Sequence, residues 1–162
     1  MLGKVFLNTS VIQYLYPMGL IHILNTLFEE VYVPLEVKEE IERGKAQGVE
    51  LPHLDEIDFI KVVGTETSSL IGIVRDLGKG KAAVILLGTE NPGSLVILDD
   101  RLAREVARAL KVKVTGTAGL LIMAKERGLI KAVKPCLDKL IDTGFYLAPE
   151  HKALILKEAN EA

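Results

Sequence analysis

Short apolar segments alternate along this chain with stretches of helical character, and this alternation constrains the fold more than any other feature. Residues 94–98 are almost wholly apolar, which is typical of a strand buried on both faces of a parallel sheet. Residues 81–87, which follow Gly78 and Gly80, are apolar on nearly every side and predict a buried helix. Strands that alternate with helices in this way predict a three-layer α/β/α fold around a central, mainly parallel sheet.

The periodicity and the turn residues assign the remaining segments. Strands are expected at residues 4–7, 30–33, 57–63, 94–98 and 111–115. Two short apolar helices, broken near Pro17 and Gly19, should precede the second strand. Further helices are expected at residues 35–43, ending at Gly44, and at 68–77, 81–87, 102–110, 118–127, 135–141 and from 149 onward. Residues 46–56 should form a surface loop.

Length, charge and cysteine content bound the class of protein. A chain of 162 residues suits a single domain, residues 1–162, with a helical tail from about residue 134. The formal net charge of −2 excludes a globally basic nucleic-acid binder, so any RNA contact must be a local patch. One cysteine and no leader-like start predict a cytoplasmic protein. We expect no membrane contact, because no apolar stretch approaches the ~20 residues of a membrane span.

Polar side chains cluster where three of the predicted strands end. Residues 8–10 follow the first strand, Asp99 and Asp100 follow the fourth, and residues 115–117 close the fifth. The carboxyl ends of parallel strands meet at one edge of the sheet, so these groups should lie close together. Glu40 can join them, because it lies beside the buried stripe of its helix. An oxygen-rich site of this kind suits Mg²⁺ or Mn²⁺ and the cleavage of phosphodiesters.

Five segments in a fixed order carry a family resemblance: L7-N-T-S10, V33-P-L-E-V-K-E-E-I41, L77-G-K-G-K-A-A83, L98-D-D-R101 and V114-T-G-T-A-G-L120. Together they resemble the PIN-domain superfamily, a group of metal-dependent ribonucleases that includes the VapC-type toxins. The resemblance spans almost the whole chain, including the helical tail that contains C136-L-D-K-L140. It implies an RNA substrate, a Mg²⁺ or Mn²⁺ cofactor, a homodimer and an antitoxin-like protein partner.

The resemblance also assigns roles to individual residues. It implies catalytic carboxylates at Glu40, Asp99 and Asp100, and metal ligands at Glu40, Asp100 and Asn8. Contacts to RNA or phosphate would come from Thr9, Ser10, Lys81, Thr117 and Arg101. The superfamily usually has an aspartate where Asn8 stands and an acidic residue where Lys81 stands.

These two replacements predict an impaired metal site. An ammonium group ~4 Å from a divalent ion would oppose its binding by roughly 8 kcal/mol at an effective dielectric constant of about 20. A millimolar site supplies only about 4 kcal/mol. We therefore expect Lys81 to form an ion pair with Glu40, Asp99 or Asp100, which would also offset its unfavourable place at a helix N-terminus.

Each of these residues also has a simpler interpretation. Aspartates before a helix commonly cap it, and our interpretation is that Asp100 faces the site while Asp99 caps or supports. Thr9, Ser10 and Thr117 are common helix starters, Glu40 alone could be a solvated charge, and Arg101 could lie on a solvated helix face. Two functional hypotheses follow. One is a VapC-like RNA-cleaving or RNA-binding protein with an impaired metal site, and the other is a non-catalytic interaction module of a toxin-antitoxin-like or regulatory complex.

Overall fold

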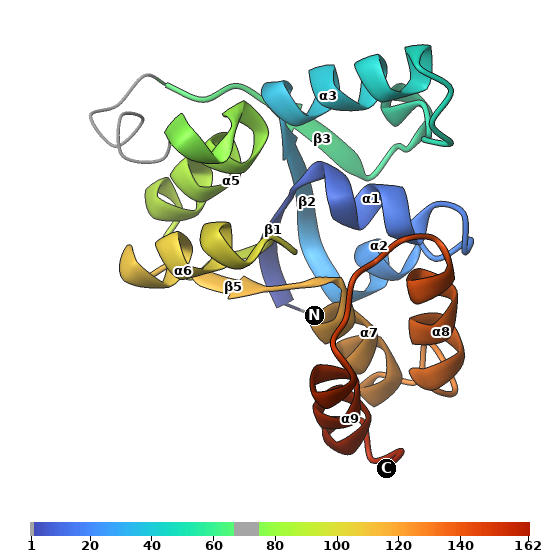
Figure 1. The fold of residues 1–162 in the computed structure, drawn as a ribbon. Helices are drawn as coiled ribbons and strands as arrows, with labels where there is room; N and C mark the ends of the chain where they lie inside the picture. The colour runs from blue at the N-terminus through green and yellow to red at the C-terminus, as the bar shows by residue number, and fades with distance from the viewer. Residues whose placement is uncertain (1, 67–74) are drawn as a thin grey trace.

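A five-stranded, all-parallel sheet forms the centre of the computed structural model, which describes residues 2–66 and 75–162 (Figure 1). The strand order is β3-β2-β1-β4-β5, so the first strand of the sequence is central. Leu7 of β1 pairs with Ile97 of β4, and Val5 pairs with Val31 of β2. The strands are β1 (Leu2–Leu7), β2 (Phe28–Pro34), β3 (Ile60–Val63), β4 (Leu95–Ile97) and β5 (Lys113–Thr115).

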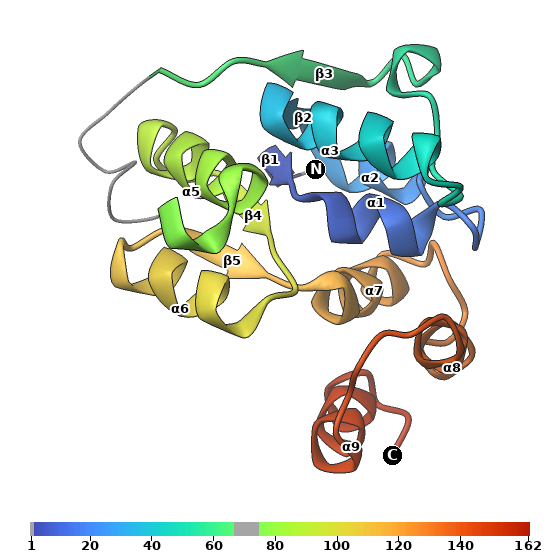
Figure 2. The ribbon, with the colours of Figure 1, turned by 45° about the horizontal axis from the view of Figure 1, so that its top comes forward.

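Helices lie on both sides of the sheet, which gives the predicted three-layer α/β/α arrangement (Figures 1 and 2). The helices that connect or follow the strands are α1 (Thr9–Leu15), α2 (Ile23–Leu27), α3 (Leu35–Ala46), α5 (Lys79–Glu90), α6 (Arg101–Ala109), α7 (Thr117–Glu126), α8 (Lys134–Asp142) and α9 (Pro149–Glu158). Within the described residues, no helix combines the length and the apolar character needed to cross a membrane.

The core explains why the strands read as continuous apolar runs. Val5, Phe6 and Leu7 of β1 are at most 2% exposed, and residues 96–98 are fully buried, because helices cover both faces of the parallel sheet. Residues 82–88 of α5 are also buried, as the apolar character of that helix predicted.

Several predicted element bounds differ from the structure. Helix α3 continues past Gly44 to Ala46, and β3 begins at Ile60 rather than at residue 57. The expected surface loop includes the 3₁₀ turn η1 (Leu54–Glu56), and its Leu51 and Leu54 side chains are buried against the core. Most of the helix predicted for residues 68–77 lies outside the described residues, and its last part is the 3₁₀ turn η2 (Arg75–Leu77).

The C-terminal helices are held to α7 by an ionic cluster around Glu161. Its carboxylate accepts hydrogen bonds from the backbone N–H groups of Val133 (2.7 Å) and Lys134 (3.0 Å) at the start of α8. The Lys125 ammonium of α7 lies 3.1 Å from the same carboxylate. These donors hold the pKa of Glu161 below its ordinary value, because they stabilise the ionised form. Asp138 of α8 likewise binds Lys152 of α9 at 2.8 Å.

Candidate functional site

The polar strand ends meet at the carboxyl edge of the sheet, as the sequence predicted. Strands β1, β4 and β5 end at this edge and are followed by the N-termini of α1, α6 and α7. The N-terminus of α5 and the second turn of α3 reach the same place. We call this set the acidic edge site, and it comprises Glu40, Lys81, Asp99 and Asp100 with the residues that bind them.

The Glu40 carboxylate links three helices. Its Oε2 accepts a hydrogen bond from Thr9 Oγ1 at 2.6 Å, and its Oε1 accepts one from the Gly80 backbone N–H at 3.1 Å. A Cβ atom on Gly80 would lie 2.3 Å from Glu40 Oε1, so only glycine permits this approach. The paired glycines at 78 and 80 are the sequence signal for this contact, and their role at the site was not predicted.

Asp99 is bound by three hydrogen-bond donors. Its Oδ1 accepts from the Thr117 backbone N–H at 2.7 Å, while its Oδ2 accepts from Thr117 Oγ1 at 2.7 Å and Ser10 Oγ at 2.8 Å. The hydroxyl groups of Ser10 and Thr117 therefore already donate their protons in hydrogen bonds to Asp99. Asp99 joins the ends of β1, β4 and β5 through these bonds.

Asp100 both caps α6 and pairs with Lys81. Its Oδ2 accepts a hydrogen bond from the Ala103 backbone N–H at 2.8 Å, which is an N-cap interaction. The cap therefore belongs to Asp100 and not to Asp99, because the side chain of the second aspartate turns back over the first turn of the helix. Asp99 has the supporting role, which was the other predicted alternative. Asp100 Oδ1 lies 3.6 Å from Lys81 Nζ, and the two side chains are 38% and 35% exposed. This contact confirms the predicted ion pair between Lys81 and the acidic cluster.

Asn8 is buried at the same edge. Its side chain is 4% exposed, and Oδ1 has no hydrogen-bond partner among the described residues. Its backbone N–H donates to the Ile97 carbonyl at 3.3 Å and so joins the ends of β1 and β4. An unpaired buried oxygen is destabilising by about 1–3 kcal/mol, which identifies Asn8 as the least satisfied group of the site.

Two further residues contact the site and were not predicted as part of it. Arg104 donates from Nη1 to the backbone carbonyls of Asp99 (3.0 Å) and Leu98 (3.4 Å), so its guanidinium faces the loop rather than solvent. Tyr14 lies near Asp99, and its pKa is raised first by burial and then by that negative charge. Arg101, in contrast, has an 89% exposed side chain that pairs with Glu105 at 3.2 Å.

The residues of this edge do not fit a divalent metal ion in their present arrangement. Three carboxylates meet two cations, Lys81 and Arg104, so the formal charge is close to −1. Each carboxylate already accepts a hydrogen bond from a helix N-terminus. Within residues 2–66 and 75–162, no three His, Cys, Asp or Glu side chains form a group that could hold a metal ion.

The fold and a family comparison together identify the class of protein. The sheet is all-parallel and has carboxylates at the carboxyl ends of its strands, where open α/β sheets place their sites. The family model described as the PIN domain matches residues 4–161, and the chain belongs to the PIN-domain family. PIN domains usually use divalent metal ions. A search of curated proteins finds no match to the chain.

Proposed function

We propose that this PIN-domain protein binds RNA at its acidic edge and does not cleave it by a metal-dependent route. The observation that carries the proposal is the Lys81–Asp100 ion pair, 3.6 Å long, at a position where the family pattern has a carboxylate. In this proposal, the ammonium group of Lys81 provides the positive charge that a divalent ion provides in other members of the family. Asn8 adds to the effect, because its amide contributes no negative charge.

RNA contact at this edge requires exposed cations, and the starts of α5 and α6 provide them. Lys79 and Arg101 are exposed, and Lys81 is partly exposed beside them. The hydroxyl groups of Thr9, Ser10 and Thr117 donate to Glu40 and Asp99, so the proposed phosphate contacts come mainly from the three cations. Such contacts bind any RNA sequence and weaken as salt rises.

The test measures binding and cleavage separately. Fluorescence anisotropy with a short labelled single-stranded RNA in EDTA should show binding by the unaltered protein. Lys81→Met should lower the slope of log Kobs against log salt by about 0.7, the value for one phosphate contact on a single strand. Lys139→Met, a change at an exposed lysine of α8, is the matched control and should leave the slope unchanged.

The cleavage assay can contradict the proposal directly. RNA is incubated with the unaltered protein and Mn²⁺, and with Asp100→Asn as the comparison. Cleavage by the unaltered protein that disappears in Asp100→Asn would establish a metal-dependent ribonuclease and refute the proposal. Cleavage gained only by Lys81→Glu would support it, because the variant restores an acidic residue at the position that the family pattern requires.

The homodimer and the antitoxin-like partner remain predictions from the family resemblance, and the cytoplasmic location remains a prediction from the cysteine content and the start of the sequence. Sedimentation equilibrium of the purified chain measures the first of these. A non-catalytic interaction role is compatible with RNA binding, since a protein partner can use a different surface.

A further inference from the structure

A second concave surface lies at the opposite edge of the sheet from the acidic edge site. Helix α1 starts at the carboxyl edge and runs back, so the chain after Leu15 lies at the amino edge, where β2 begins at Phe28 and β3 at Ile60. Between these segments is a cleft of about 670 Å³, which we call the amino-edge cleft. Figures 1 and 2 both show the two segments on the right, away from α5 and α6.

One part of the amino-edge cleft is apolar and partly aromatic. Tyr16, which is 38% exposed, and Ile21 come from the chain around the end of α1. Ile57 and Phe59 come from the segment that leads into β3. This volume is within the range of about 300–1,000 Å³ that is typical of ligand-binding pockets.

The other part of the cleft is acidic. Glu56 and Asp58 line it and are exposed, and neither forms an ion pair with a described residue. Among the described residues, no lysine or arginine lines the cleft. The two carboxylates therefore give this surface a negative charge that the cleft itself does not balance.

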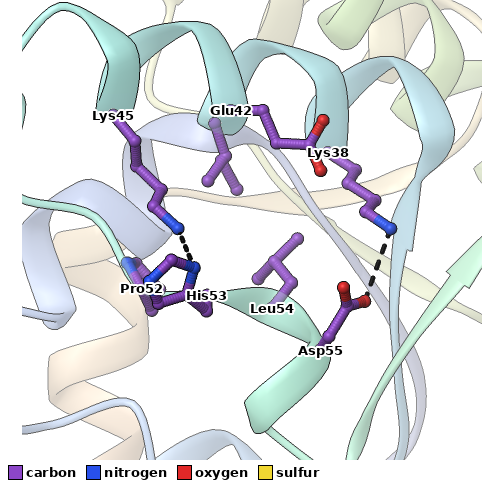
Figure 3. Close-up of a pocket in the computed structure, with 8 residues that line it drawn as sticks. Lys38, Glu42, Lys45, Pro52, His53, Leu54 and Asp55 are labelled. Carbon is purple, nitrogen blue, oxygen red and sulfur yellow. Dashed lines mark hydrogen bonds and ion pairs between the residues drawn. The ribbon is translucent and has the colours of Figure 1, made fainter.

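The neighbouring small cavity shows the contrasting case, in which the chain neutralises its own charges (Figure 3). There Asp55 pairs with Lys38 at 3.4 Å, and the Lys45 ammonium points at Nδ1 of His53. His53 lines both cavities, so the two surfaces are neighbours.

We propose that the amino-edge cleft binds a basic segment of a partner protein, in which an arginine or lysine lies next to an apolar residue. The apolar side chain packs on Tyr16 and Phe59, and the cation pairs with Glu56 and Asp58. RNA is disfavoured here, because its phosphates carry the same charge as the two carboxylates. The cleft and the acidic edge site lie at opposite edges of the sheet, so the protein can hold a partner and RNA at the same time.

The proposal predicts that a basic peptide binds in the amino-edge cleft and that its affinity depends on its positive charge. The probe is the capped peptide Leu-Arg-Leu-Arg, and the matched probe carries citrulline, which has the shape of arginine without its charge. Amide and side-chain NMR signals of the full chain are followed during titration. The arginine peptide should shift signals of Tyr16, Ile21 and Phe59, and the citrulline peptide should bind about 2- to 30-fold more weakly, as expected for loss of two exposed ion pairs.

Substitutions of the two cleft carboxylates test whether they bind the charged peptide. The double variant Glu56→Gln/Asp58→Asn should weaken the arginine peptide by a similar factor, whereas Glu126→Gln at an exposed site on α7 should not. Equal affinity for the two peptides, or shifts centred on Glu40 and Asp99, would overturn the proposal. Single-stranded RNA that shifts the cleft signals would overturn it as well. Failure of RNA binding at the acidic edge leaves this prediction unchanged, so the two proposals are tested separately.

Discussion

Replacing Lys81 with methionine should increase the affinity of the acidic edge site for Mn²⁺ by roughly 10²- to 10⁴-fold. Lys81 Nζ lies 3.6 Å from Asp100 Oδ1, and an ion bound to that oxygen would be about 2.1 Å from it. The ammonium would then be at most about 5.7 Å from the ion. Repulsion at that distance is about 6 kcal/mol at an effective dielectric constant of 20, and about 3 kcal/mol at 40. The lower value suits these side chains better, since both are about one third exposed.

Isothermal titration calorimetry with Mn²⁺ measures this change. Methionine has an unbranched apolar side chain one atom shorter than that of lysine, so packing along the stem is largely retained. Lys79→Met is the matched control, because Lys79 is exposed in the same helix turn. Adding Asp100→Asn to the Lys81→Met variant should abolish the gain. Equal Mn²⁺ affinity of the unaltered protein and Lys81→Met would refute the reasoning, whether both bind the ion or neither does.

Three further predictions concern stability and are checked by chemical denaturation. Gly88→Ala should destabilise the protein by about 1 kcal/mol or more, because its Cβ would lie 2.6 Å from a methyl group of buried Val112, whereas Gly64→Ala, with open space around it, should not. Folding lowers the pKa of Glu161, so this carboxylate stabilises the folded protein above its ordinary pKa of 4.5 and loses that contribution as the pH falls through its folded-state pKa. In Glu161→Gln, the free energy of unfolding should therefore fall less steeply as the pH is lowered. A Glu161→Gln profile parallel to that of the unaltered protein would contradict this assignment. Asp100→Ala should cost about 1 kcal/mol through loss of the α6 cap, and Asp100→Asn should retain most of that stability.

The fold was largely predictable because strands buried on both faces of a parallel sheet are continuous apolar runs in the sequence. Strand β4 and residues 82–88 of helix α5 show this most clearly, since both segments are largely apolar and largely buried. The end of α3 was not predictable. Gly44 resembles a helix terminator, but a Cβ there would lie 2.8 Å from Leu51 Cδ1, so the glycine permits close packing of the following loop.

The positions of the candidate site were predictable, but the orientations of its side chains were not. Topology places the ends of parallel strands together, and this brings Asp99 and Asp100 to the edge where Glu40 and Lys81 also lie. Two adjacent aspartates give no sign of which one caps the helix, because that depends on the turn between β4 and α6. The catalytic and metal-binding roles assigned to these residues remain predictions.

The residues missed at the site are those whose role depends on long-range contacts. Arg104 lies on the same helix as the exposed Arg101, yet its guanidinium binds the carbonyls of the β4–α6 turn. Tyr14 was not singled out at all. It packs edge-to-face on Phe145 with ring centroids 5.1 Å apart, and Phe145 lies 131 positions further along the chain. No local pattern encodes a contact of that kind.

The central position of β1 has a consequence for how the chain acquires its structure. One side of β1 can pair with β2 soon after synthesis, but its other neighbour, β4, appears about 90 residues later, as the pairing of Leu7 with Ile97 shows. At translation rates of about 5–20 residues per second, that interval is roughly 5 to 18 s. During that interval, one edge of the central strand has no partner strand within the chain. An unpaired strand edge can pair with another chain, so closing the β1–β4 ladder removes a site of aggregation.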